Sequence, residues 1–143
     1  MLPFFVYGTL RPGERNHDGL LRGRVSAAHP ARLHGAVLYD GPGYPFLVEQ
    51  PGGAVRGELL TAAAGEYASL LDALDRLEGH VPGDPGSLYE RVQREVLRET
   101  DGTAVRAWVY VAGPSIAPRL RARGALIEGG DWLNRGRGRP GPG

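Results

Sequence analysis

The segment EYASLLDALDRLEGH, residues 66–80, carries the clearest helix signal in a chain whose other periodic segments are short and strand-like. Glu66–Leu77 contains neither Gly nor Pro, and leucines recur in it at helical spacing: Leu70, Leu71, Leu74 and Leu77. Asp72 and Arg76 lie four residues apart on the opposite face, and Gly79 is the glycine that commonly follows a helix end. We therefore predict one amphipathic helix that buries its leucine face.

The segments on either side of this helix have the composition of strands and are separated by Gly and Pro, which number 23 and 12. Before the helix we predict strands at Phe4–Tyr7, Gly23–Ala28, Arg32–Tyr39, Phe46–Val48 and Ala54–Leu60, with a hairpin-like turn at Pro51-Gly52-Gly53. After it we predict Tyr89–Arg98 and Thr103–Val111, joined at Asp101-Gly102, which is a strong hairpin signal.

Many strands with one clear helix, and no repeated strand-helix-strand rhythm, argue against a doubly wound sheet. We predict an α+β domain over residues 1–135, with a strongly curved or closed sheet and helices packed outside it. Residues 136–143 form an Arg/Gly/Pro tail that cannot bury apolar surface, and we expect it to be flexible.

Composition excludes several classes of chemistry. The chain has no cysteine, which removes disulfides, thiolate nucleophiles and Cys-ligated metals. All 17 basic residues are arginine, which removes Schiff-base chemistry and the P-loop lysine. The net charge of +1 requires neither nucleic acid nor an anionic membrane as a partner. Because no apolar run approaches a membrane span and Met1–Tyr7 is typical of a strand and not of a signal peptide, we expect a cytoplasmic protein.

Glu78 is the most informative polar residue of the helix. It lies seven and four residues after Leu71 and Leu74, and therefore on the apolar face. Desolvation there, together with the negative end of the helix dipole, would raise the pKa of its carboxyl, as a general base near neutral pH requires. A glutamate at a helix end can equally extend into solvent.

A second signal is Tyr7-Gly8-Thr9-Leu10-Arg11, where a buried strand ends at a glycine. A turn at this point leaves successive backbone N–H groups outside the strand ladder, where they can bind a carboxylate or an oxyanion. A plain strand-to-loop turn explains the same string.

Together these strings have a recognisable order: Tyr7-Gly8-Thr9-Leu10, then Leu74–Gly79, then Tyr89-Glu90-Arg91, with Gly130-Asp131-Trp132 near the end. From Phe5 to about Tyr110 the arrangement resembles the gamma-glutamylcyclotransferase-like superfamily, and its short members, the gamma-glutamylamine cyclotransferase and bacterial relatives, in particular. The resemblance implies a small mixed β-barrel with flanking helices, and neither a metal nor an organic cofactor. It also implies that Tyr7, Gly8, Thr9 and Leu10 bind the substrate and that Glu78 is the catalytic acid/base.

The implied reaction is cleavage of a γ-glutamyl amide, a small-molecule substrate, with release of 5-oxoproline. The α-amine attacks its own γ-carbonyl and closes a lactam, so that the enzyme needs no nucleophile of its own. Arg91 could pair with a substrate carboxylate, or be a surface arginine. Tyr110 could present its hydroxyl to the pocket, or be a core aromatic, and Tyr44-Pro45 could form the rim or simply pack in its loop.

Other chemistry finds no support in the sequence. The four histidines show no zinc-binding spacing, and the four serines lie in no GxSxG elbow. The alternative from another class is a binding protein of the same fold that holds a small acidic metabolite without turning it over. A carboxylate at position 78 favours the enzyme, although the same group could bind an ammonium. The sequence does not identify the leaving amine or the oligomeric state.

Overall fold

The computed structural model of this chain describes residues 1–8, 10–11, 21, 23–41, 44–80, 84 and 86–134. The predicted tail at 136–143 lies outside these residues. In chain order the elements are β1 (Phe4–Val6), β2 (Val25–Asp40), β3 (Pro45–Ala62), α2 (Tyr67–Glu78), β4 (Tyr89–Arg98), β5 (Ala104–Ala112), α3 (Ala117–Arg123) and β6 (Leu126–Ile127), followed by 3₁₀ turns at Glu128–Gly130 and Trp132–Asn134. The chain is α+β, as predicted.

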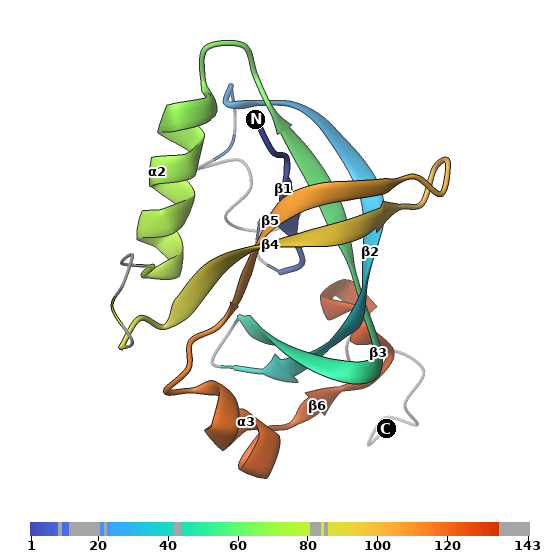
Figure 1. The fold of residues 1–143 in the computed structure, drawn as a ribbon, viewed down its shortest axis with the longest axis vertical. Helices are drawn as coiled ribbons and strands as arrows, with labels where there is room; N and C mark the ends of the chain where they lie inside the picture. Colours follow the sequence, from blue (N-terminus) through green and yellow to red (C-terminus); the bar gives the residue numbers. More distant parts are fainter. Residues whose placement is uncertain are drawn as a thin grey trace, which may run out of the picture.

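The strands close into a small mixed barrel (Figure 1). Their order is β3-β1-β5-β4-β2, and β2 pairs back with β3 to complete the ring. The first strand is central to this closure, because Phe4 faces Leu60 of antiparallel β3 on one side and Trp108 of parallel β5 on the other. β6 pairs with β2 outside the ring. The predicted mixed β-barrel with flanking helices is confirmed.

The long hairpin of β2 and β3 differs from the sequence prediction. The two strands predicted at Gly23–Ala28 and Arg32–Tyr39 are one continuous strand, and those predicted at Phe46–Val48 and Ala54–Leu60 are another. The two strands pair along nearly their whole length. Long, bent strands of this kind let a few strands close into a barrel.

The predicted turn at Pro51–Gly53 is wrong, because these residues form a bulge within β3. The pairs on either side are His34 with Ala54 and Ala36 with Glu49. Residues 50–53 therefore lie opposite the single residue Gly35 of β2, and Gly52 has a φ of 88°, which favours glycine. The Pro51-Gly52-Gly53 string, which suggested a turn, therefore forms a bulge inside a continuous strand.

Helix α2 agrees with the prediction to within one residue. It runs from Tyr67 to Glu78 and ends at Gly79, which has left-handed backbone angles and donates its N–H to the carbonyl of Arg76. Leu70 and Leu74 are fully buried against the barrel. The predicted exposed ion pair is also present, with Arg76 Nη2 3.1 Å from Asp72 Oδ2.

The β4–β5 hairpin is likewise confirmed. Its strands pair from Tyr89 with Ala112 to Leu97 with Ala104, and Gly102 turns the chain with a φ of 71°.

Alternate residues of the strands face two hydrophobic clusters. One contains residues of all five barrel strands and none of α2, and therefore fills the barrel; its members include Phe5, Leu33, Val55, Val96 and Val109. The other joins the outside of the barrel to α2, and its members include Phe4, Leu60, Leu70, Leu74 and Tyr110. Because β1 contributes to both clusters, its end is fixed between the barrel and the helix.

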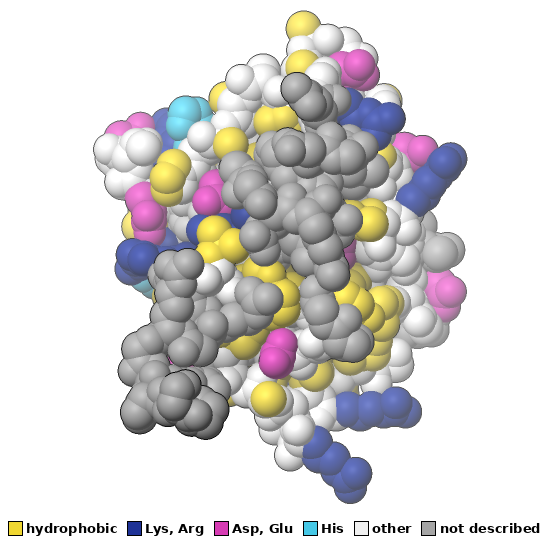
Figure 2. Space-filling view, turned by 180° about the vertical axis from the view of Figure 1, so that it is seen from behind, with side chains coloured by type: hydrophobic (Ala, Val, Ile, Leu, Met, Phe, Trp, Pro, Cys, Tyr) yellow, Lys and Arg dark blue, Asp and Glu magenta, His cyan; other side chains and the backbone are white. Residues whose placement is uncertain are grey.

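The surface carries mixed charge. Figure 2 shows one face, on which several arginine side chains extend from the edges, hydrophobic side chains gather toward the middle, and acidic side chains lie in both regions. Within the described part of the chain, no helix has the length and apolarity needed to cross a membrane.

Candidate active site

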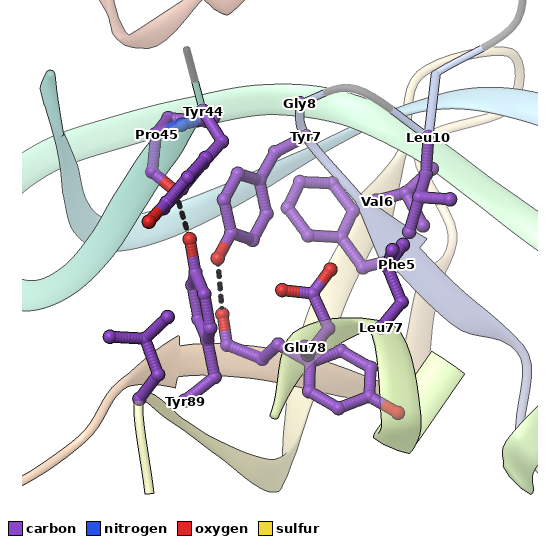
Figure 3. Close-up of a pocket in the computed structure, with 12 residues that line it drawn as sticks. Phe5, Val6, Tyr7, Gly8, Leu10, Tyr44, Pro45, Leu77, Glu78 and Tyr89 are labelled. Atoms are coloured by element: carbon purple, nitrogen blue, oxygen red, sulfur yellow. Dashed lines mark hydrogen bonds between the residues drawn. The ribbon is translucent and has the colours of Figure 1, made fainter. Parts of the chain in front are cut away.

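A cavity of about 260 Å³ opens where the end of β1 meets the C-terminal end of α2 and the start of β4. Figure 3 shows the residues that line it: Phe5, Val6, Tyr7, Gly8, Leu10, Tyr44, Pro45, Leu77, Glu78, Leu88, Tyr89 and Tyr110. Both sequence signals thus contribute to one cavity, although they are some seventy residues apart in the chain.

Glu78, the last residue of α2, places its carboxylate inside the cavity. The carboxylate is directed toward Phe5 of β1 and toward Tyr7, which directly follows β1 (Figure 3). It is the only charged side chain among the described residues of the lining. Within the described ranges no hydrogen-bond donor reaches this carboxylate, so desolvation acts on it uncompensated. Burial therefore raises the pKa of Glu78 from 4.5 to about 7.

Tyr7, which directly follows β1, is hydrogen-bonded to β5. Its hydroxyl donates a hydrogen bond to the backbone carbonyl of Tyr110, as the dashed line in Figure 3 shows. Burial raises the pKa of Tyr7 well above its usual value, and the nearby Glu78 carboxylate acts in the same direction. Tyr7 is therefore a neutral, oriented hydroxyl beside the carboxylate.

The chain turns directly after Tyr7. The N–H of Arg11 donates to the carbonyl of Gly8 at 3.0 Å, which closes a turn over residues 8–11. The strand pairing of β1 ends at Val6, so the amide of Gly8 lies beyond the ladder. A Cβ atom on Gly8 would lie 2.8 Å from Cδ of Pro45, so this close approach requires glycine. Thr9, which the sequence also predicts to bind substrate, lies outside the described residues.

The side chain of Arg11 anchors this turn. Its guanidinium is buried and binds two carboxylates, with Nε 2.7 Å from Glu58 Oε2 and Nη1 2.6 Å from Asp131 Oδ1. The sequence analysis placed Arg11 at the end of the second signal and gave its side chain no role. Its partners lie in β3 and after the 3₁₀ turn at Glu128–Gly130. Asp131 stood in the last motif string, but no local pattern shows that either carboxylate pairs with Arg11.

The sequence analysis offered Arg91 as a partner for a substrate carboxylate and the Tyr110 hydroxyl as a polar group of the pocket. In the structure both groups bind another residue of the protein. Both bind Asp75 of α2: Arg91 Nε lies 2.9 Å from Asp75 Oδ1, and the Tyr110 hydroxyl donates to the same oxygen. Arg91 also stacks over Trp108, with its guanidinium carbon 4.2 Å from the ring centroid, and does not line the cavity. Tyr110 does line it. The structure therefore brings together Tyr7, Gly8, Leu10, Glu78 and Tyr110, and leaves Arg91 outside.

Tyr89 is a wall residue to which sequence reasoning gave no role. It is buried, stacks on Phe46 and donates its hydroxyl to the carbonyl of Pro45 at 2.7 Å (Figure 3). Burial and the Glu78 carboxylate raise its pKa. Tyr44 and Pro45, for which a rim position was one of two interpretations, do line the cavity. Tyr89 stood in the third motif string, and that was the only signal that could have found it.

The arrangement suits proton transfer. It provides one carboxyl group with a pKa near neutrality, neutral tyrosines around it, and the backbone of a fixed turn opposite. Nowhere in the described ranges do three or more acidic or histidine side chains come together in a group able to hold a metal ion.

Comparison with known proteins shows the family to which this barrel, with a carboxylate in its cavity, belongs. Residues 4–134 match the family described as "Gamma-glutamyl cyclotransferase, AIG2-like". The chain belongs to this family.

Individual relatives agree with that assignment. The chain is 35% identical over 112 residues to the "Gamma-L-glutamyl-butirosin B gamma-glutamyl cyclotransferase" of Niallia circulans; the match covers 75% of this chain and 64% of that protein, so the chain spans less than two thirds of the relative. A Vibrio cholerae protein whose name provisionally assigns it to the gamma-glutamylcyclotransferases is 34% identical over 131 residues, which is 92% of this chain and 95% of the relative.

Solved structures share the fold. The solution structure of Escherichia coli ytfP is 26% identical and covers 94% of this chain and 98% of its own, with a TM-score of 0.62. The solution structure of Arabidopsis thaliana At3g28950.1 is 30% identical, with a TM-score of 0.63. The match covers 84% of this chain and 67% of that chain.

Proposed function

We propose that this protein is a cyclotransferase that cleaves a γ-glutamyl amide into 5-oxoproline and a free amine, with Glu78 as the acid/base. The observation that carries the proposal is the Glu78 carboxylate, which lies in the cavity with a pKa of about 7 and faces the end of β1. Membership of the gamma-glutamyl cyclotransferase, AIG2-like family supports the reaction class.

The reaction begins with the α-ammonium of the substrate, which has no lone pair and cannot attack. Glu78 takes one proton from it, and the resulting amine attacks the γ-carbonyl carbon within the same molecule. The new C–N bond closes the five-membered ring, and the amide bond to the leaving nitrogen then breaks. Glu78 returns its proton to that nitrogen. The attacking nitrogen loses a second proton as it becomes the lactam nitrogen, and the departing amine takes one up to become ammonium, so that the net charge is unchanged.

The protein holds the reactants and stabilises charge. The backbone N–H groups of Gly8, Thr9 and Leu10 would bind the α-carboxylate or the oxyanion of the tetrahedral intermediate, while the N–H of Arg11 closes the turn. One such oxyanion donor typically contributes about 10²–10³-fold. Tyr7 fixes the start of this turn through its hydrogen bond to the Tyr110 carbonyl. In this proposal the ring of Tyr110 forms part of the wall, while Arg91 acts through Asp75 and touches no substrate.

The test is incubation of the purified protein with a panel of γ-glutamyl amino acids and amines, followed by quantification of 5-oxoproline. We expect stoichiometric 5-oxoproline and amine from at least one substrate. The Glu78→Gln variant should bind the substrate but lose about 10²–10⁴-fold in kcat, the usual contribution of a general acid/base. Glu90→Gln, which alters an exposed carboxylate on β4, is the matched control and should keep full activity.

Two results would contradict the proposal in different ways. Calorimetric binding of γ-glutamyl amides with no 5-oxoproline from any of them would favour the non-catalytic binding protein. Turnover of Glu78→Gln at the wild-type rate would leave an enzyme whose acid/base lies elsewhere.

A further inference from the structure

Two leucines at the cavity are exposed to solvent. Leu77, in the last turn of α2, and Leu88, just before β4, both line the cavity, yet they are 44% and 37% exposed. Large apolar side chains that stand in solvent beside a cavity are a common mark of a binding surface. We call Leu77 and Leu88 the rim leucines.

The polar groups of the adjoining wall are already in use. The hydroxyls of Tyr7 and Tyr89 donate to the backbone carbonyls of Tyr110 and Pro45, and that of Tyr110 donates to Asp75. Three of the four tyrosines in the described lining therefore have no hydroxyl proton left for a ligand.

The cavity also offers few charged groups to a ligand. Glu78 is the only charged side chain in the described lining, and its carboxylate points toward the first strand segment, where the α-amine of a γ-glutamyl group would meet it (Figure 3). Arg91 is held by Asp75 and Trp108 and lies outside the cavity. A charged group placed against the rim leucines would lose part of its hydration and gain no oppositely charged partner among the described lining residues.

We propose that the leaving group of this enzyme is an apolar amine, so that its substrates are γ-glutamyl amides of alkyl or arylalkyl amines whose hydrocarbon part covers Leu77 and Leu88. This inference rests on the proposed cyclotransferase function. The sequence does not identify the leaving amine. An amino acid or a diamine carries a further charged group beyond the amide nitrogen, whereas an alkyl or arylalkyl amine does not, and this difference favours the apolar amine.

The experiment compares three substrates that differ only at the far end of the leaving group: the γ-glutamyl amides of n-butylamine, 4-aminobutyrate and 1,4-diaminobutane. We expect kcat/KM for the butyl amide to exceed both others by at least about tenfold, the range that pocket contacts of this size give. A kcat/KM for either charged amide equal to or above that of the butyl amide would overturn the inference.

Variants connect the preference to the rim. Leu77→Ser and Leu88→Ser should each raise KM for the butyl amide several-fold and leave kcat near its wild-type value, since the contact lies away from the reacting atoms. Leu88→Arg should raise kcat/KM for the 4-aminobutyrate amide at the expense of the butyl amide. Leu126→Ser is the matched control, because Leu126 is also 44% exposed but lies on β6, outside the cavity.

The failures of the two proposals are distinguishable. If none of the three amides, nor any other γ-glutamyl compound, yields 5-oxoproline, the cyclotransferase function itself fails, and this inference fails with it. If 5-oxoproline forms and the charged amides are preferred, the apolar leaving group is refuted and the cyclotransferase function stands. If Leu126→Ser changes the preference as much as the rim variants do, the contact of the leaving group with Leu77 and Leu88 is refuted.

Discussion

The guanidinium of Arg11 and the carboxylate of Asp131, 120 residues apart in the chain, are joined by a hydrogen bond of 2.6 Å between Nη1 and Oδ1. On its other side the same guanidinium binds both oxygens of Glu58 on β3, at 2.7 and 3.1 Å. The turn at residues 8–11, which borders the cavity, is thereby tied to the barrel wall and to the C-terminal segment. One buried cation holds three parts of the chain together.

Arg11→Ala should strongly destabilise the protein. The substitution leaves the carboxylates of Glu58 and Asp131 facing each other with their shared cation removed, and breaking a buried ion pair typically costs about 3–5 kcal/mol. Urea unfolding measures this loss. Arg11→Lys keeps the charge but not the two-sided geometry, and should recover only part of the stability.

A surface pair provides the control for Arg11. In the Asp72–Arg76 pair the side chains are 63% and 80% exposed, and such exposed pairs contribute little because of solvent screening. Arg76→Ala should therefore leave the urea midpoint nearly unchanged. Equal midpoints for Arg11→Ala and Arg76→Ala would contradict the anchoring role.

The rate should depend on pH through Glu78. The base must be ionised to accept a proton from the α-ammonium, so kcat/KM should fall tenfold for each pH unit below the pKa of the free enzyme. That pKa is about 7, because burial opposes the charge. A profile of kcat/KM from about pH 3.5 to 9 should bend near 7. A bend near the ordinary glutamate value of 4.5 would show that the carboxylate is solvated in the working enzyme.

Local signals predicted the elements that are decided locally. The Gly- and Pro-free run with spaced leucines gave α2, and Asp101-Gly102 gave the β4–β5 hairpin, because each depends on neighbours in sequence. The β2–β3 hairpin could not be predicted in the same way. Glycines in a turn and in a bulge look alike in the sequence, and only the pairing with β2 shows that residues 50–53 bulge within a continuous strand.

The site shows the same limit. The helical phase relative to Leu74 predicted that Glu78 could face inward, and the structure places its carboxylate in the cavity. Strand alternation gives the side on which Arg91 lies, but not that Asp75 of α2 would be opposite it. These residues lie in the motif strings, but the pairing of Asp75 with Arg91, or of Asp131 with Arg11, is set by tertiary packing and cannot be predicted from the sequence near either residue.

The stability of the folded protein should also depend on pH through Glu78. It should fall as pH rises, whereas the activity should rise. Its pKa is about 7 in the folded chain and 4.5 when unperturbed, so between these values the folded state binds more protons than the unfolded state. The free energy of unfolding therefore falls as pH rises through this window, by up to about 3 kcal/mol for such a shift. Glu78→Gln carries no charge and should escape this loss.

Urea unfolding of wild type and Glu78→Gln at several pH values measures the difference. The two proteins should be similar near pH 4, where the carboxyl is protonated, and the variant should be the more stable above pH 7.5. All other titrating groups are common to both chains and cancel in the comparison. A constant difference across the range would mean that Glu78 is not desolvated.

Gly8 provides a test of the turn that faces Glu78. In Gly8→Ala the new Cβ would lie 2.8 Å from Cδ and 2.9 Å from Cγ of Pro45, closer than packed carbon atoms allow. The ring of Pro45 is rigid, and its carbonyl accepts the Tyr89 hydroxyl, so the turn at residues 8–11 is the part that must shift. Displacement of a binding group by about 1 Å can cost about 10²-fold in rate. We expect kcat/KM to fall at least tenfold, with an overpacking cost of about 1–3 kcal/mol in stability.

Two further variants separate this clash from a general effect of losing glycine. In Gly86→Ala the Cβ would meet, among the described residues, the carboxylate Oδ1 of Asp84 alone, at 3.3 Å. That exposed side chain can move, so activity should be kept. Pro45→Ala removes both ring atoms that oppose the new methyl group. Gly8→Ala should therefore reduce kcat/KM much less in a Pro45→Ala background than in the wild type. If the loss is equally large in both backgrounds, the contact with Pro45 is not what requires glycine at position 8, and the backbone of the turn itself must be the cause.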